Sequence, residues 1–143
     1  MQTNNSLIFL VDDDLFHLEI MKQLLTAAGY TKLQAFISGV DCLEHLHEQP
    51  AVVFLDQQMD VYTGYETLRK IKRYNPNIFV VMVSAQEDLD TAVASLKHGA
   101  FDYIRKDQFL EKNIIAVMHK IEEVKILLQA RKPSFIKSLF KFL

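Results

Sequence analysis

The sequence has a single cysteine, Cys42, so it can form no internal disulfide. Cysteine used this sparingly favours a reducing compartment. Long hydrophobic runs are also missing, since the longest clearly apolar run, Ile78 to Val83, is far shorter than the roughly 20 residues of a membrane-spanning helix. The polar start, residues 1–6, lacks the layout of a signal peptide. We therefore expect a soluble, cytoplasmic protein.

A large excess of charge of either sign is missing as well. The 143 residues include 16 lysines and arginines and 18 aspartates and glutamates, a formal net charge of −2, which argues against a general nucleic-acid binder. The charge is unevenly distributed, because five basic residues and no acidic one follow Glu123. Removing these five leaves 11 basic against 18 acidic residues in positions 1–123, or −7. The five are Lys125, Arg131, Lys132, Lys137 and Lys141.

What the sequence does have is a regular alternation of short apolar runs and amphipathic segments. Continuous apolar runs are typical of strands buried on both faces of a parallel sheet. Apolar residues at helical spacing predict helices between the runs, as with Leu89, Val93 and Leu96. The predicted strands are 7–11, 33–36, 51–55, 78–83 and 102–105, and the predicted helices follow Asp14 (as far as Gly29) and Ser38, cover 64–74 and 88–98, and begin near Glu111.

Five strands that alternate with helices through short connections require crossover units. We therefore expect one α/β domain with a parallel sheet, and 143 residues suffice for a core that needs no metal or disulfide. Such a sheet binds ligands outside the carboxyl ends of its strands.

Polar side chains stand at the ends of four of the five predicted strands: Asp12 and Asp13, Asp56, Ser84 and Lys106. If the first and third strands are neighbours, three carboxylates converge, and either a pKa rises or a cation binds. Oxygen ligands with room for water suit Mg²⁺ better than zinc. A carboxylate can attack phosphorus to give an acyl phosphate, while a metal, an ammonium and a hydroxyl hold the phosphoryl oxygens. Singly, each residue fits a cap, a turn or a surface charge, but together they predict a phosphoryl-transfer site.

Four segments resemble the receiver domains of bacterial two-component response regulators. The resemblance covers roughly residues 7–128 and implies a flavodoxin-like, doubly wound sheet of strand order 2-1-3-4-5 with five flanking helices. We place a stand-alone, chemotaxis-receiver-like domain at residues 6–130 and a basic amphipathic C-terminal extension at 131–143. The matching segments are Leu-Val-Asp-Asp (10–13), Val-Val-Phe-Leu-Asp (52–56) with Gly64 eight residues later, Val-Ser-Ala (83–85) and Gly-Ala-Phe-Asp-Tyr-Ile-Arg-Lys (99–106).

The resemblance implies a phosphoacceptor and its metal ligands. Asp56 would accept the phosphoryl group, and Asp13 and Asp56 would ligate Mg²⁺ directly. Asp12 would act on the metal through water, and the backbone carbonyl of Gln58 would be a further ligand.

The resemblance also implies a switch. Ser84 would move to bond the phosphoryl group, Tyr103 would change rotamer with it, and Lys106 would bond a phosphoryl oxygen. Asp107 stands where the family has a proline after a cis peptide, and a non-proline cis bond costs about 3–4 kcal/mol, so this peptide is either trans or a strained cis.

Three more positions either differ from the family pattern or lie where the family adjusts the lifetime of the phosphoryl group. Asp60 replaces a common proline after the phosphoacceptor, and Gln58 and Gln86 occupy positions that affect phosphate lifetime. The histidines lie apart, and we assign surface or packing roles to all five, His17 on the first helix included.

The last ten residues form an amphipathic pattern. They admit a short helix on the domain itself or on a second copy, or a docking segment for a partner or an anionic membrane surface. The apolar side has Phe135, Ile136, Leu139, Phe140 and Leu143, and the basic side has Lys137 and Lys141.

The pattern as a whole predicts a phosphorylation-controlled interaction module that is no enzyme towards an external substrate. Its partners would be a histidine kinase or phosphotransfer protein upstream and a protein target downstream, without nucleic acid, and a homodimer stays open. Two rivals are a pseudo-receiver that works without phosphorylation, which Asp107 keeps open, and a small phosphatase that uses Asp56 and would need a substrate-binding cap.

Overall fold

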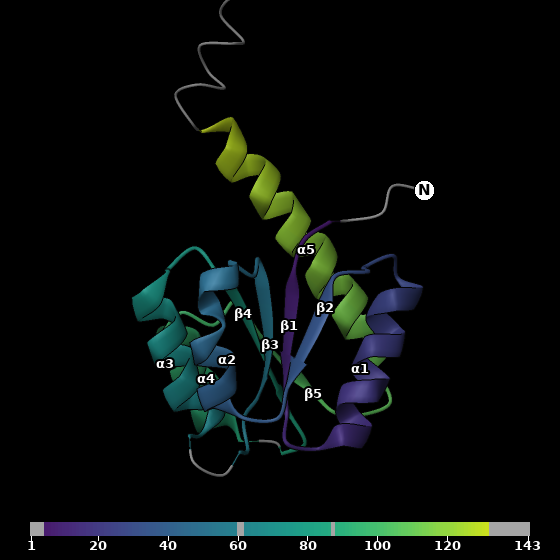
Figure 1. The fold of residues 1–143 in the computed structure, drawn as a ribbon, viewed down its shortest axis with the longest axis vertical. Coiled ribbons are helices and arrows are strands. Elements are labelled where there is room, and N and C mark those ends of the chain that lie inside the picture. Colours follow the sequence, from purple (N-terminus) through teal and green to yellow (C-terminus); the bar gives the residue numbers. More distant parts are fainter. Residues whose placement is uncertain (1–4, 60–61, 87, 132–143) are drawn as a thin grey trace, which may run out of the picture.

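The computed structural model describes residues 5–59, 62–86 and 88–131. They form a parallel five-stranded sheet of order β2-β1-β3-β4-β5 with helices on both faces (Figure 1). The predicted α/β architecture and strand order are therefore confirmed. The strands are β1 (Ile8–Val11), β2 (Leu33–Phe36), β3 (Val52–Asp56), β4 (Phe79–Ser84) and β5 (Asp102–Arg105).

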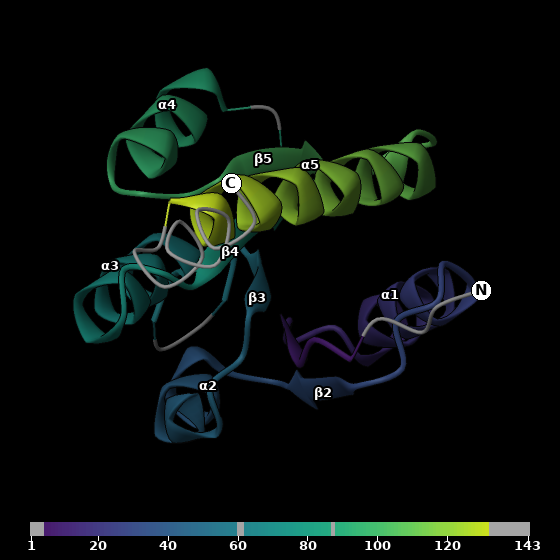
Figure 2. The ribbon, with the colours of Figure 1, turned by 90° about the horizontal axis from the view of Figure 1, so that it is seen from above.

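The helices form the outer two layers (Figure 2). One face of the sheet is covered by α1 (Leu15–Ala27) and α5 (Leu110–Ala130). The other face is covered by α2 (Gly39–Glu44), α3 (Gly64–Tyr74) and α4 (Leu89–Lys97), with a 3₁₀ turn, η1 (Leu46–Glu48), after α2. No helix within the described ranges has both the length and the apolar character needed to cross a bilayer.

Burial on both faces explains why β1 is apolar at every position. Ile8 and Leu10 pack into the core beneath α1 and α5, whereas Phe9 and Val11 pack into the core beneath α2 and α3. Burying one such side chain contributes about 1.5–3 kcal/mol. A polar residue at any of these positions would lose this contribution, so the strand has no polar alternation.

Side-chain caps mark where α1, α2, α3 and α4 begin, and two of these residues, Asp14 and Ser38, stand directly before helices that the sequence predicted. The Asp14 carboxylate accepts hydrogen bonds from the Phe16 and His17 N–H groups, which confirms its predicted role at the start of α1. Gly29 follows α1 with φ of 101°, a left-handed conformation that favours glycine. The remaining caps are Ser38 for α2, Thr63 for α3 and Asp88 for α4.

Two details differ from the predictions. Asp56 and Ser84 are the last residues of their strands rather than the first residues after them. The apolar stripe of α4 is the larger difference, because Leu89, Val93 and Leu96 are 75%, 41% and 47% exposed. The buried residue of α4 is Ser95, whose small side chain faces inward, so the helical spacing was right but the face it indicated is not the packed one.

Candidate functional site

The candidate site lies at the carboxyl ends of the strands, at the lower end of the sheet in Figure 1. Because β1, β3, β4 and β5 are parallel, all four strands end at the same edge of the sheet. Val11 is in register with Leu55, and Asp56 with Val83, so the strand ends align closely. The polar residues that the sequence placed at strand ends are thus brought to one edge.

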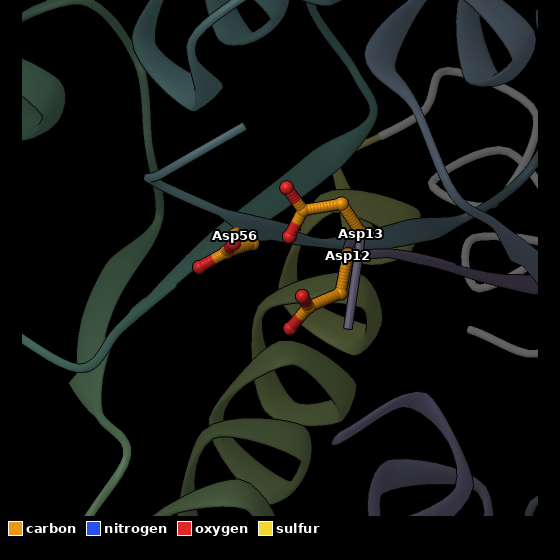
Figure 3. A group of neighbouring side chains, drawn as sticks. All are labelled: Asp12, Asp13 and Asp56. Atoms are coloured by element: carbon orange, nitrogen blue, oxygen red, sulfur yellow. The ribbon is translucent and has the colours of Figure 1, made fainter. Parts of the chain in front are cut away.

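Three carboxylates meet at this edge (Figure 3). Asp12, Asp13 and Asp56 each offer an oxygen, and these atoms all lie within 4.8 Å of one another. Asp12 and Asp56 are 3% and 5% exposed, whereas Asp13 is exposed to solvent. Hard oxygen ligands with one open side fit Mg²⁺, which keeps several waters. The donor set therefore fits the metal that the sequence predicted.

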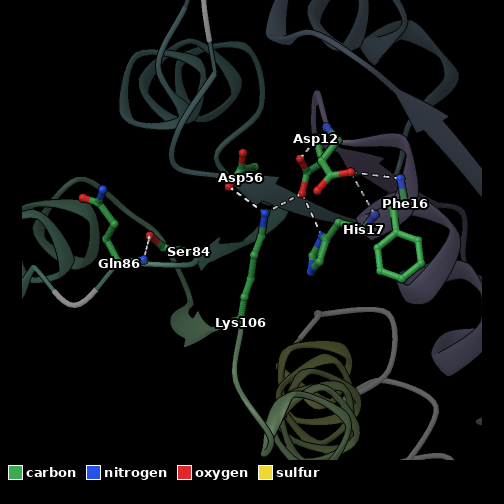
Figure 4. A network of polar contacts seen from close by, with 8 residues as sticks. Asp12, Phe16, His17, Asp56, Ser84, Gln86 and Lys106 are labelled. Carbon is green, nitrogen blue, oxygen red and sulfur yellow. Dashed lines mark hydrogen bonds and ion pairs between the residues drawn. The ribbon is translucent and has the colours of Figure 1, made fainter.

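Lys106 lies between two of these carboxylates (Figure 4). Its Nζ is 2.7 Å from Asp12 Oδ2 and 3.2 Å from Asp56 Oδ1. Burial alone would lower the pKa of Lys106, but the two carboxylates outweigh burial and raise it. The ammonium therefore stays charged and offsets part of the negative charge.

The loop that carries Lys106 needs no proline to deliver it. The Lys106 N–H donates to the Ser84 carbonyl at 2.8 Å, which attaches this residue to the end of β4. The peptide between Lys106 and Asp107 is trans, as are all others in the described residues. Lys106 therefore lies beside the carboxylates even though Asp107 stands where the family has a proline.

Burial and neighbouring charges shift the pKa values of the two buried carboxylates in opposite directions. Burial and the charge of Asp12 raise the pKa of Asp56 to about 6, against the opposing effect of Lys106. Burial also opposes ionisation of Asp12, but contacts with His17, Lys106 and the Asp14 N–H outweigh it and lower this pKa to about 2. Asp12 is thus a permanent anion, and Asp56 is an unusually basic carboxylate near neutral pH.

A cavity of about 430 Å³ opens beside Asp56. It holds the predicted switch residues, because Ser84 and the partly buried Tyr103 both line it. The Ser84 hydroxyl is 1% exposed and accepts a hydrogen bond from the Gln86 N–H at 3.1 Å. The other lining residues are Gln57, Gln58, Met59, Thr63, Gln86, Asp88 and Thr91. Asp60 lies outside the described residues, as do residues 132–143 of the predicted extension.

The sequence reading missed one residue of the site. His17 was assigned a surface or packing role, but its Nδ1 lies 2.7 Å from Asp12 Oδ2, the oxygen that Lys106 also contacts (Figure 4). The available signal was its place in the first turn of α1, directly after the aspartates. A helix that starts at the carboxyl end of a strand places its first turn beside the site there.

Comparison with known proteins agrees with this arrangement. The model of the response regulator receiver domain family matches residues 8–119. The transcriptional regulatory protein ZraR of Escherichia coli K12 is 36% identical over 141 residues, which are 98% of this chain and 32% of that protein. The DNA-binding transcriptional regulator NtrC of the same organism is 32% identical over 116 residues, 80% of this chain and 24% of that protein.

Solved structures show the same fold. A response regulator receiver domain protein from Clostridium thermocellum has a TM-score of 0.79 at 28% identity, covering 86% of this chain and 98% of that one. A CheY-like receiver domain protein from Methanospirillum hungatei JF-1 has a TM-score of 0.76 at 26% identity, covering 84% and 96%.

The chain spans about a quarter to a third of the length of the curated relatives it matches. The family model covers most of the chain, and the fold and the carboxylate cluster at its strand ends agree with it. This chain belongs to the receiver domains of two-component response regulators.

Proposed function

We propose that Asp56 accepts a phosphoryl group from a phosphohistidine of a histidine kinase or phosphotransfer protein, with Mg²⁺ as the cofactor. The observation that carries this proposal is the convergence of Asp12, Asp13 and Asp56 within 4.8 Å, with Lys106 against two of them. Carboxylates this close together, two of them buried, need positive charge, and the Lys106 ammonium supplies only part of it.

The metal would be held by Asp13 and Asp56 directly, by Asp12 through water and by the Gln58 backbone carbonyl. When bound, it supplies positive charge to the phosphoryl oxygens and orients them for in-line transfer. The exposure of Asp13 supports this assignment of direct and water-mediated ligands, because the open side of the cluster admits water molecules and the phosphoryl donor.

The chain's own residues would carry the transfer. An Asp56 carboxylate oxygen attacks the phosphorus, the bond from phosphorus to the donor's histidine nitrogen breaks, and that nitrogen keeps the electron pair. Lys106 then pairs with a phosphoryl oxygen, and it already lies 3.2 Å from Asp56. The Ser84 hydroxyl would donate a hydrogen bond to another phosphoryl oxygen. Tyr103, which lines the same cavity, would change rotamer when Ser84 moves.

The experiment is phosphorylation with acetyl phosphate and Mg²⁺, followed by intact-mass measurement. We expect one added phosphoryl mass on the wild type and none on Asp56→Asn. Asp90→Asn is the matched control, because Asp90 is an exposed aspartate in the first turn of α4 and lies outside the lining of the cavity. A wild type that gains no mass while it binds Mg²⁺ would favour the pseudo-receiver, and steady hydrolysis of a generic phosphate ester would favour the phosphatase.

The proposal includes a signalling role without turnover of an external substrate. The domain would catalyse only its own phosphorylation and dephosphorylation and would pass the signal to a protein target. DNA binding is in the name of NtrC and concerns that protein; for this chain we propose protein partners. We place the domain in the cytoplasm, whose reducing conditions suit the free, buried Cys42.

We further propose that the domain comprises residues 6–130 and that residues 131–143 are a docking extension. The end of α5, which projects past the sheet in Figure 1, supports a contact there, because Ile126, Leu127 and Leu128 in its last turns are 69%, 64% and 51% exposed. We predict that deletion of residues 134–143 changes sedimentation or partner pull-down while phosphorylation on Asp56 persists. Unchanged sedimentation together with unchanged pull-down would contradict this role.

A further inference from the structure

We propose that His17 is a positioning residue for the metal site, one that holds the Asp12 carboxylate in place both beside Lys106 in the unphosphorylated domain and when Lys106 turns to the phosphoryl group. The inference rests on the proposed function above. It adds a residue on α1 to a site otherwise built from the ends of strands β1, β3, β4 and β5.

The contact between His17 and Asp12 is short and buried. Nδ1 of His17 lies 2.7 Å from Oδ2 of Asp12, and the two side chains are 10% and 5% exposed. If Nδ1 carried no proton, its lone pair would face a carboxylate oxygen and the two would repel each other. The ring proton is therefore assigned to Nδ1. The two atoms are within hydrogen-bond distance, but they are not aligned well enough to form a hydrogen bond.

Packing alone does not explain a histidine at this position. Both ring nitrogens of His17 are buried, and neither makes a well-aligned hydrogen bond to any described residue. A buried polar group without a good partner is unfavourable, and an apolar side chain of similar size would avoid that cost. Asp12 is therefore the polar group that accounts for the imidazole.

Every oxygen of Asp12 has a donor nearby. Oδ1 accepts the Asp14 N–H at 2.9 Å, and Oδ2 is shared by His17 Nδ1 and Lys106 Nζ, each at 2.7 Å (Figure 4). Asp14 also caps the turn that carries His17, since its carboxylate accepts the His17 N–H at 3.4 Å. The loop and the first turn of α1 thus hold the ring and the carboxylate in a fixed relation.

The two donors on Oδ2 differ in what else they can reach. Lys106 Nζ is also 3.2 Å from Asp56 Oδ1, so negative oxygens added to Asp56 would draw the ammonium away from Asp12. Within the described residues, the carboxylate that His17 contacts is that of Asp12, so the imidazole would stay. It would then be the remaining side-chain donor to Oδ2, keeping Asp12 oriented towards the metal and its water.

The test measures Mg²⁺ binding by isothermal titration calorimetry with magnesium chloride alone, without a phosphoryl donor. His17→Leu keeps the volume and removes the donor, and His17→Asn places an amide nitrogen near the position of Nδ1. Loss of a group that orients a metal ligand typically weakens metal binding by about 10–100-fold. We expect the Kd of His17→Leu to rise about tenfold and that of His17→Asn to stay within about threefold of wild type.

Two controls separate positioning from folding. Met21 lies one turn along the same face of α1 and is 3% exposed, so Met21→Leu repacks the same core while the His17 imidazole is kept. The melting temperature in EDTA should be unchanged or raised in His17→Leu, whereas a purely structural role would lower it. His17→Ala serves as the second donor-free variant if His17→Leu does not fold.

The outcomes are distinct. A Kd for His17→Leu equal to that of the wild type would overturn the role of His17 and leave the proposed function intact. A wild type that binds no Mg²⁺ would overturn the proposed function, and the role of His17 with it. Weakened binding in His17→Leu and His17→Ala, with recovery in His17→Asn, would establish the positioning role.

Discussion

The carboxylate of Asp56 is held where its charge is unfavourable as long as no cation is bound. Burial and the neighbouring Asp12 raise its pKa to about 6, compared with an ordinary value of 3.8. Each pKa unit corresponds to about 1.4 kcal/mol between the two protonation states. Ionised Asp56 therefore destabilises the metal-free domain at neutral pH. A cation bound beside Asp56 would offset this unfavourable free energy.

Asp56→Asn should consequently stabilise the metal-free domain in a pH-dependent way. Since the folded pKa is raised, the favourable contribution of the neutral acid is complete below about pH 4 and is lost as the pH rises through about 6. In EDTA we predict that the variant is more stable than wild type by about 1–3 kcal/mol at neutral pH and nearly equal at about pH 4. Chemical denaturation at several pH values measures this, with exposed Asp90→Asn as control. A difference that is constant with pH would contradict the burial argument.

Individual residues also mark the limit of what sequence could predict. Asp12, Asp13, Asp56, Ser84 and Lys106 were found because each stands at the end of a predicted strand, which is a local property of the chain. His17 was not found, because its place in the first turn after the aspartates is one that an ordinary packing residue also occupies. The distance to Asp12 Oδ2 is what distinguishes it from such a residue.

The junction of β3 and α3 limits which residues can occupy position 64. The Gly64 N–H donates to the Gln57 carbonyl at 3.0 Å, which folds the start of α3 against the end of β3. A Cβ on Gly64 would overlap the Asp56 carbonyl oxygen and would lie 2.7 Å from Gln57 Cα. These are backbone atoms, so no side-chain rotation can make room, and any substitution must move the strand end that carries Asp56.

Gly64→Ala should therefore disturb stability and metal binding together. We predict a loss of about 2–3 kcal/mol in the free energy of unfolding, the upper range for overpacking, and a weaker response to Mg²⁺. Gly29→Ala is the control, because Gly29 has φ of 101° but a Cβ added there would meet no described atom within 4 Å; it should cost about 1–2 kcal/mol and leave Mg²⁺ binding unchanged. Urea denaturation and calorimetric titration check both variants. Wild-type Mg²⁺ affinity in Gly64→Ala would contradict the proposed clash.

Helix α4 shows how an element can be predicted correctly while its orientation is not. The spacing of Leu89, Val93 and Leu96 indicated a helix, and the helix is there. Its apolar stripe nevertheless faces outward, because the side that meets the sheet is the one with the small residue Ser95. Periodicity is a property of the helix alone, whereas the buried face depends on what space the neighbouring elements leave.

The metal site exists only in the folded molecule. Asp12 and Asp13 are more than forty positions away from Asp56 in the sequence, and the pairing of β1 with β3 brings them within 4.8 Å. An unfolded chain keeps them apart, so we expect Mg²⁺ to bind the native state preferentially and to stabilise it by mass action. Stability and metal binding are therefore linked across the whole domain.

Magnesium should raise the thermal stability of the domain well beyond the effect of salt. At a Mg²⁺ concentration ten times the Kd, we predict a gain of about 1.4 kcal/mol, or roughly 3–5 °C in the melting temperature. Sodium chloride at matched ionic strength is the control, because it screens the carboxylates without occupying the site. Differential scanning calorimetry of wild type and Asp13→Asn measures the gain, which should largely disappear in the variant. Equal melting temperatures in both salts would count against a metal site.

The sequence by itself determined the five apolar strands, their helical connections and the polar residues that end them. These are local features, since an apolar run stops at a charge and a helix starts at its cap wherever the segment lies in space. The tertiary structure decided which of these residues touch. It placed Lys106 against Asp12 and Asp56 through a trans peptide, turned the apolar stripe of α4 outward and brought His17 to Asp12. Contacts of this kind depend on strand pairing and on the packing of α1 against the sheet, which no single segment encodes.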